Sequence, residues 1–176
     1  MRVLVTGATG FLGRHVLPVL AERHKVVAMA RRPVEGFETV VADLTDEFEL
    51  PAGLDAVVHL AQSRRYREWP EGAADMYAVN VHATFRLLAR AGAGRFVYAS
   101  TGGIYAPSPA PLREDDPVAP SGFYPRSKLA AEVLGTFVLA YGQSPAARTD
   151  CVHGCLYSGL PGTRGHAPAG SGRACG

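Results

Sequence analysis

Short valine-rich runs alternate with longer helical patterns over the first 141 residues, and this alternation constrains the fold most. Uninterrupted short apolar runs are typical of strands buried on both faces of a parallel sheet. The predicted strands are Arg2–Thr6, Lys25–Ala30, Thr39–Ala42, Ala56–Leu60 and Arg95–Ala99. The clearest helical patterns are Phe11–Arg23, Ala74–Ala91 and Tyr124–Tyr141. This order predicts an α/β fold, a doubly wound parallel sheet with right-handed crossovers.

The composition supports one packed domain and excludes several classes of protein. The chain has 176 residues, of which 47% are apolar and 19% charged. Its formal net charge of +2 is too small to favour nucleic acid or an anionic membrane as a partner. No segment approaches the length and hydropathy of a membrane span, and the start lacks the apolar segment of a secretory signal. We therefore expect a cytoplasmic protein that binds neither nucleic acid nor a membrane.

The composition and the apolar pattern of the sequence change at about residue 142. The last 35 residues hold 8 of the 20 glycines and 3 of the 13 prolines. They contain no apolar run that would predict a strand and no helical face. The sequence therefore divides into residues 1–141, an α/β domain, and residues 142–176, an irregular or disordered tail.

All three cysteines lie in that tail, so a disulfide framework is not expected in the main body. Cys151 and Cys155 lie near His153 and His166, but their spacing matches no strong zinc pattern. No metal site is predicted.

A glycine cluster follows the first predicted strand directly and begins the first helix. Gly7 permits a tight turn, and Gly10 lets the backbone approach a pyrophosphate. Gly13 allows the helix to pack closely on the strand. Phosphates would then face backbone N–H groups at the positive end of the helix. At this position the spacing indicates dinucleotide binding by a Rossmann-type sheet.

Two arginines after the second strand indicate which dinucleotide is preferred. Domains that bind NAD place a carboxylate at the end of this strand, where the present chain has Ala30. Arg31 and Arg32 follow, and a guanidinium suits a 2′-phosphate. The alternative is a solvated pair of arginines. We favour NADP over NAD as the cofactor.

A tyrosine and a lysine at the start of the last helix are candidate catalytic groups. Tyr124 and Lys128 are four residues apart and therefore share one helical face. A lysine ammonium beside a phenol lowers the pKa of the phenol toward a useful range. Ser100 and Thr101 end the fifth strand and bring hydroxyls to the carboxyl edge of the sheet, where such folds bind ligands.

Together these residues resemble the extended short-chain dehydrogenase/reductase family, the NAD(P)-dependent nucleotide-sugar epimerases and dehydratases. The resemblance covers residues 1 to about 141, and its motifs occur in the family's order. The matching segments are Thr6–Gly13 (TGxxGFxG), Asp43–Leu44 (the adenine pair), His59–Gln62 (HxA), Asn80–Thr84 (NVxGT), Tyr98–Thr101 with Ile104–Tyr105 (the catalytic strand and VYG), and Tyr124–Lys128 (YxxxK).

The resemblance implies a set of site residues. The implied catalytic residues are Thr101, Tyr124 and Lys128. The implied cofactor-binding residues are Gly7, Gly10, Phe11, Leu12, Gly13, Arg31, Arg32, Asp43, Leu44, Leu60, Ala61, Gln62, Asn80, Ser100, Tyr124 and Lys128. Tyr124 would exchange a proton with a substrate hydroxyl or carbonyl while the nicotinamide exchanges a hydride at the same carbon. Lys128 would hold the nicotinamide ribose, and Thr101 would hydrogen-bond the reacting oxygen.

Several of these residues also have purely structural interpretations. His59 can be a packed core histidine, Asp43 can cap a turn before Thr45, and Asn80 can tie a helix to a loop. A solvated loop is likewise an alternative to a substrate-phosphate site for the arginines around Tyr66, which are Arg64, Arg65 and Arg67.

Two departures from the family's pattern narrow the expected function. Gly102 and Gly103 stand where family dehydratases carry an Asp-Glu pair, which argues against a sugar 4,6-dehydratase. Family members also continue for a long stretch that builds the substrate lobe, so the resemblance implies that this C-terminal lobe is missing. The change at residue 142 indicates a frameshift or a degraded reading frame.

Two functions follow as hypotheses. The first is an oxidoreductase or epimerase that acts on a nucleotide-sugar or a related carbonyl or hydroxyl compound. The second is a catalytically silent NADP-binding module, or the remnant of an enzyme. The resemblance also implies a homodimer through the helices that carry Asn80 and Tyr124.

Overall fold

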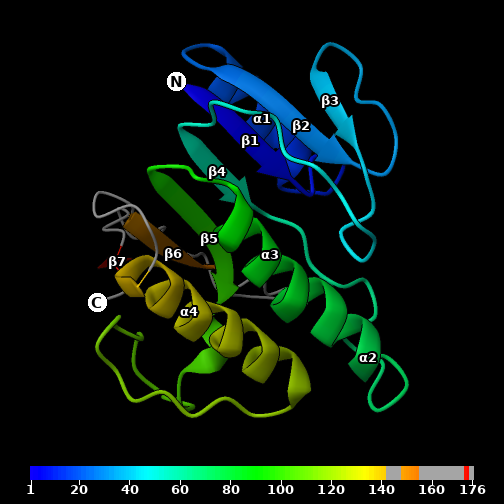
Figure 1. The fold of residues 1–176 in the computed structure, drawn as a ribbon. Coiled ribbons are helices and arrows are strands. Elements are labelled where there is room, and N and C mark those ends of the chain that lie inside the picture. Colours follow the sequence, from blue (N-terminus) through cyan, green and yellow to red (C-terminus); the bar gives the residue numbers. More distant parts are fainter. Residues whose placement is uncertain (142–147, 155–172, 175–176) are drawn as a thin grey trace.

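The computed structural model describes residues 1–141, 148–154 and 173–174, and in these residues one seven-stranded sheet organises the fold (Figure 1). The strands are β1 (Arg2–Thr6), β2 (Lys25–Ala30), β3 (Glu38–Val41), β4 (Ala56–His59), β5 (Arg95–Thr101), β6 (Arg148–Gly154) and β7 (Arg173–Ala174). Their order across the sheet is β3-β2-β1-β4-β5-β6-β7, and all neighbours are parallel except β6 and β7. The predicted doubly wound α/β sheet is therefore confirmed.

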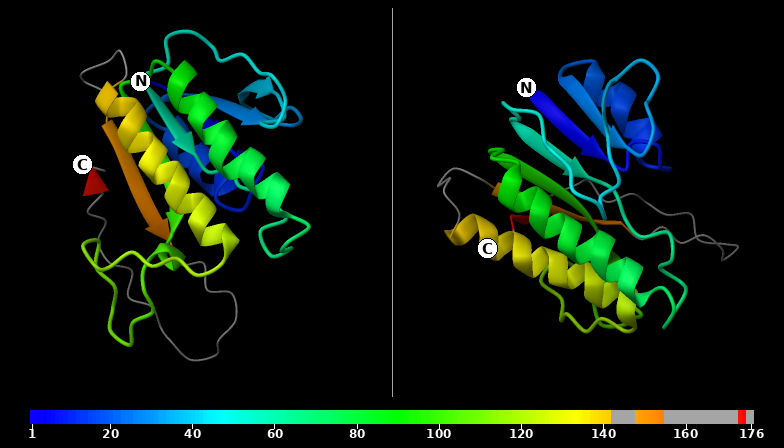
Figure 2. Two further views of the ribbon diagram at one scale, coloured as in Figure 1. Left: turned by 60° about the horizontal axis from the view of Figure 1, so that its bottom comes forward. Right: turned by 45° about the vertical axis from the view of Figure 1, so that its right-hand side comes forward.

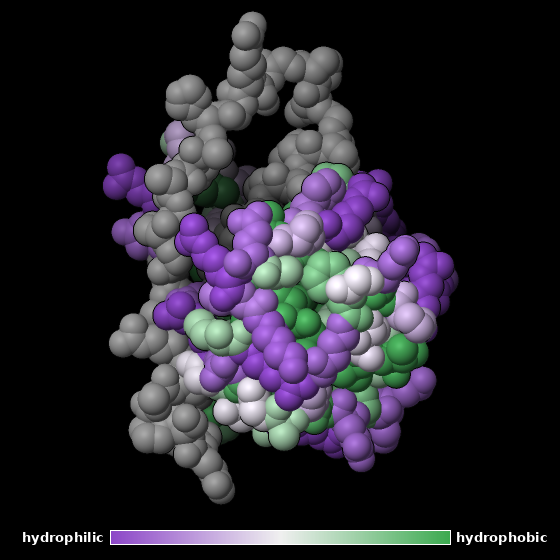
Figure 3. Space-filling model, turned by 90° about the horizontal axis from the view of Figure 1, so that it is seen from above, coloured by the Kyte–Doolittle hydropathy of each residue, from purple (hydrophilic) through white to green (hydrophobic). Residues whose placement is uncertain are grey.

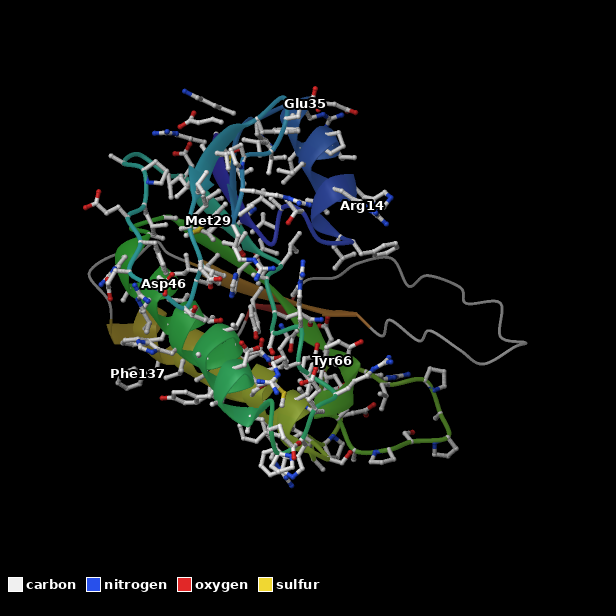
Figure 4. The ribbon with its side chains drawn as sticks, turned by 90° about the vertical axis from the view of Figure 1, so that its right-hand side faces the viewer. Arg14, Met29, Glu35, Asp46, Tyr66 and Phe137 are labelled. Carbon is white, nitrogen blue, oxygen red and sulfur yellow. The ribbon has the colours of Figure 1, made fainter. Side chains whose placement is uncertain are left out.

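Helices cover both faces of the sheet. They are α1 (Gly13–Ala21), α2 (Ala73–Met76), the π-helical η1 (Tyr77–His82), α3 (Ala83–Arg90), the 3₁₀ turn η2 (Gly102–Ile104) and α4 (Phe123–Tyr141). Figure 4 shows α1 on one side of the sheet and α3 and α4 on the other. The two views of Figure 2 show α3 and α4 side by side.

Successive residues of β1 enter two separate apolar cores, because neighbouring side chains on a strand point to opposite faces. Leu4 belongs to the core beneath α3 and α4, together with Leu87 and Phe96. Val5 belongs to the core beneath α1, together with Leu17. All five are at most 3% exposed, which explains why the strands read as unbroken apolar runs.

The sequence predicted no strand beyond Tyr141, and that part of the prediction is wrong. β6 pairs with β5 in parallel register from Arg95 opposite Arg148 to Thr101 opposite Gly154. The sheet ladder is made by backbone groups, so the edge of β5 can align a segment that has little apolar character of its own. The ion pair between Arg95 and Asp150, at 3.5 Å, adds a contact across this register.

The remaining expectations for the tail lie outside the described residues. These include Cys155 and His166, two members of the rejected zinc pattern, and most of the segment interpreted as a frameshift. The boundary at residue 142 stays a prediction.

Hydrophilic side chains surround smaller groups of hydrophobic ones on the face of the molecule seen in Figure 3. None of the helices in residues 1–141 combines the length and the hydropathy that crossing a bilayer would require.

The parallel strands bring three loops to one edge of the sheet. Because β1, β4 and β5 run in the same direction, their carboxyl ends meet there. The loops after β1 and β4 carry the glycine cluster and the segment Leu60–Gln62, and Thr101 is the last residue of β5.

Candidate functional site

The glycine loop after β1 has a conformation that side chains would prevent. Gly7 has φ +66°, and a Cβ on it would lie 2.7 Å from the backbone nitrogen of Ala61. A Cβ on Gly13 would overlap the carbonyl oxygens of Gly7 and Ala8. The Gly10 N–H donates to the Gly7 carbonyl at 2.9 Å, which closes the turn. The tight turn and the close helix packing expected from the sequence are both present.

The loop after β4 is fixed against the glycine loop. The N–H of Leu60 donates to the Thr6 carbonyl at 3.3 Å, and the N–H of Ala61 donates to Thr6 Oγ1 at the same distance. Phe11 and Leu12, at the other side of the glycine loop, are 62% and 39% exposed. The two loops thus form one backbone surface at the carboxyl edge.

His59 is a core residue that links the end of β1 to α3 beneath the carboxyl edge of the sheet. Its side chain is fully buried, with Nδ1 2.5 Å from Thr6 Oγ1 and Nε2 2.9 Å from Thr84 Oγ1. Burial, with a smaller contribution from the Lys128 charge, lowers the pKa of His59 to about 3. The imidazole is therefore neutral at physiological pH, and the structural interpretation of His59 is the one that its surroundings support.

Asn80 ties three segments together. Its Oδ1 accepts the Ser63 N–H at 2.9 Å, and its Nδ2 donates to Ser127 Oγ at 3.0 Å. Ser127 in turn donates to the Tyr124 carbonyl at 2.7 Å. The side chain of Asn80 is fully buried, so its contacts position the first turn of α4 and with it Tyr124.

The Tyr124 hydroxyl donates to Oε1 of Gln62 at 2.7 Å, which joins α4 to the loop after β4. Thr101 lies at the end of β5, where its Oγ1 accepts the Gly103 N–H at 3.2 Å. The carboxyl edge therefore presents the phenol of Tyr124 and the hydroxyl of Thr101 from two different elements.

The expected lowering of the Tyr124 pKa by Lys128 is wrong in this structure. Burial raises the pKa of Tyr124 above its ordinary value, and the neighbouring Tyr66 adds to the increase. Lys128 instead lies beneath the site with its Nζ 4.4 Å from the centre of the Tyr98 ring. The reason is desolvation, because a half-buried phenol loses the water that would stabilise its anion.

The pKa of Lys128 is also shifted, and Glu132, a residue that the sequence analysis did not select, contributes to the shift. Lys128 is 1% exposed, and burial lowers its pKa to about 8, while the charge of Glu132 acts in the opposite direction. The hydroxyl of Ser100, an expected cofactor residue, donates to the Glu132 carboxylate. The signal for Glu132 was its place four residues after Lys128 on the same helical face.

Beyond β2 and β3, a hollow of about 590 Å³ is lined by residues that include Arg31 and Asp43. Asp43 caps the turn that follows, accepting the Thr45 N–H at 3.0 Å and the Thr45 hydroxyl at 2.8 Å. These bonds, and Arg31 at 3.9 Å, lower the pKa of Asp43 against the effect of burial. Arg32 is exposed, and Leu44 packs against the core. Arg31 thus lies on the rim of a space beside the second strand.

A second hollow, of about 470 Å³, lies against Tyr124 and was not predicted. The Tyr66 ring lies 5.4 Å from the Tyr124 ring, and Trp69 stacks on Phe123 at 4.9 Å. Figure 4 labels Tyr66 in this region. The sequence signal was the basic cluster around Tyr66, of which Arg65 forms an ion pair with Glu68 at 2.7 Å.

Known proteins share both the sequence and the fold. Residues 3–149 match the NAD dependent epimerase/dehydratase family. The chain is 34% identical to an L-arabinose 1-dehydrogenase (NAD(P)(+)) of Haloferax volcanii, over 77% of this chain and 60% of that protein. It is also 34% identical to a UDP-glucose 4-epimerase of Azospirillum brasilense, over 84% of this chain and 51% of that protein.

Two solved structures have the same fold. One is a short-chain dehydrogenase/reductase superfamily protein from Agrobacterium tumefaciens with bound NAD, at 35% identity and TM-score 0.75, covering 87% of this chain and 48% of that one. The other is MoeE5 in complex with UDP-glucose and NAD, at 31% identity and TM-score 0.73, covering 87% and 54%. The chain spans about half the length of the proteins that it matches. It belongs to the NAD-dependent epimerase/dehydratase family.

Proposed function

We propose that the protein is an NAD(P)-dependent oxidoreductase or epimerase that acts at a hydroxyl or carbonyl carbon of a nucleotide-sugar. The observation that carries the proposal is the hydrogen bond of Tyr124 to Gln62, in the loop that packs against Gly7, together with the position of Thr101 at the end of β5 on the same edge of the sheet. Relatives named as a UDP-glucose 4-epimerase and a sugar dehydrogenase support the class of substrate.

The residues at the carboxyl edge fit a dinucleotide. Gly7 and Gly13 leave no side chain in the loop that precedes α1, and a Cβ at either position would meet backbone atoms. Backbone N–H groups at the start of α1 suit the negative charge of a pyrophosphate. Leu60 and Ala61 border the same loop. When bound, the nicotinamide cofactor supplies the acceptor or donor of hydride.

The chain's own groups would handle the proton. Because burial raises the pKa of Tyr124, its phenol is neutral at physiological pH and can donate a proton to a substrate oxygen. Thr101 accepts the Gly103 N–H through its Oγ1, so its own hydroxyl proton can be directed at the same oxygen. Lys128 places a buried cation behind the site and would hold the nicotinamide ribose.

A catalytically silent NADP-binding module is the second candidate. It is favoured by the hydrogen bond that holds the Tyr124 hydroxyl on Gln62 and by the burial of Lys128, whose ammonium lies over the Tyr98 ring. Both contacts occupy groups that hydride transfer would need free. Turnover separates the two candidates.

Removal of the Tyr124 hydroxyl tests the catalytic role. In Tyr124→Phe we expect turnover of a UDP-sugar substrate to fall by about 10²- to 10⁴-fold, because the proton donor is lost. The Tyr77→Phe control removes an exposed hydroxyl from η1 and should turn over the substrate at the wild-type rate. Steady-state assays with UDP-glucose and UDP-glucuronic acid make the measurement. Cofactor binding without turnover in the unmodified chain would instead establish the silent module.

The preference for NADP is also proposed, because Arg31 and Arg32 follow Ala30 where an NAD site has a carboxylate. The melting temperature of the protein should rise more with NADPH than with NADH. A cofactor present at a hundred times its Kd stabilises the folded state by about 2.7 kcal/mol. Arg31→Gln should reduce the NADPH effect and spare that of NADH. The control is Arg23→Gln, which changes an exposed arginine in the turn after α1. An equal or larger rise with NADH would contradict the preference.

We further propose a homodimer formed through the outer faces of η1, α3 and α4. Four large apolar side chains there are at least 42% exposed: Tyr77, Phe85, Val133 and Phe137. Burying such a patch removes apolar surface from water. Sedimentation velocity should show a dimer that Phe85→Glu dissociates, whereas Val19→Glu, on exposed α1 surface, leaves it intact. A wild-type monomer at micromolar concentrations would refute the assembly.

A further inference from the structure

The hollow beside Tyr124 combines flat apolar walls with positive charge. Trp69 and Phe123 stack at 4.9 Å with their rings 27° apart, which makes a broad aromatic surface. The hollow holds about 470 Å³, a size that suits a small ligand. Arg67 and Arg126 belong to its lining, which contains no acidic residue.

The two arginines are not neutralised by carboxylates in the described part of the chain. Neighbouring Arg65 forms an ion pair with Glu68 at 2.7 Å, whereas no such pair involves Arg67 or Arg126. The guanidinium of Arg67 instead lies 5.1 Å from the centre of the Tyr66 ring. A cation held against an aromatic face keeps its N–H donors available for an anion.

The position of the hollow limits which part of a substrate can enter it. Tyr124 is itself part of the lining, and the Tyr66 ring lies 5.4 Å from the Tyr124 ring. A group that occupies the hollow therefore lies beside Tyr124, close to the sugar ring whose oxygen Tyr124 would protonate. In the proposed function the arginines of the lining would face substituents of that sugar.

We propose that this hollow is a carboxylate subsite and that the protein prefers an acidic, uronic acid-type sugar nucleotide over a neutral one. The inference rests on the proposed function and adds the class of sugar to it. A carboxylate offers two coplanar acceptor oxygens, which match the parallel N–H donors of a guanidinium. The stacked rings of Trp69 and Phe123 would pack against the apolar surface of the pyranose. A neutral hydroxymethyl group would leave both arginines without a charged partner.

The single tryptophan of the chain, Trp69, reports occupancy of the hollow directly. UDP-glucuronic acid and UDP-glucose form a matched pair of probes, because they share the nucleotide and differ by a carboxylate in place of a hydroxymethyl group. In titrations of the full 176-residue chain followed by tryptophan emission, we expect UDP-glucuronic acid to bind at least about tenfold more tightly than UDP-glucose.

Charge-removing variants test whether the arginines cause this preference. Arg67→Gln and Arg126→Gln should each narrow the ratio of the two dissociation constants toward one, mainly by weakening UDP-glucuronic acid. Arg23→Gln removes the same charge from an exposed position in the turn after α1 and should leave the ratio unchanged. Melting curves of each variant establish that it folds.

The proposal is overturned if the two sugar nucleotides bind equally, if neither changes the emission of Trp69, or if the arginine variants keep the full preference. A different outcome would contradict the proposed function. Selective binding of UDP-glucuronic acid with no turnover would remove the catalytic role and keep the subsite, whereas turnover without any preference for the acidic sugar would remove the subsite alone.

Discussion

The site depends on the close approach of two backbone loops at the carboxyl edge of the sheet. Gly7 can rest against Ala61 because it carries no side chain, and its positive φ turns the chain into α1. Thr6 and His59 hold the ends of β1 and β4 together from below through a buried hydrogen bond. Gln62 lies in the loop after β4, and Tyr124 lies on the helix that Asn80 ties to that loop, so both depend on this junction.

Much of the fold followed from local chemistry. The apolar runs identified β1 to β5 to within two residues. The signal was clearest for β1 and β2, which are buried along almost their whole length and are therefore apolar on both faces. The glycine spacing identified the loop, because its backbone conformation excludes side chains at Gly7 and Gly13. β6 escaped prediction because its register comes from the edge of β5 and not from its own side chains.

The pKa shifts at the site could not be predicted from the spacing of residues in the sequence. Tyr124 and Lys128 share a helical face, yet the ammonium lies over Tyr98 while the phenol donates to Gln62. Which group controls a pKa depends on burial and on partners distant in sequence, and here burial raises the pKa of Tyr124 and lowers that of Lys128. The hollow lined by Tyr66 and Trp69 was hidden for the same reason, since its walls come from separate segments.

The most direct test of this account is the dissociation constant for NADPH in two glycine variants. Gly7 and Gly53 both have positive φ, +66° and +68°, but a Cβ would crowd Ala61 at Gly7 and meet nothing within 4 Å at Gly53. Gly7→Ala should lose at least about tenfold in affinity, whereas Gly53→Ala should bind NADPH like the wild type. Wild-type affinity in Gly7→Ala, or an equal loss in both variants, would contradict the role assigned to the loop junction.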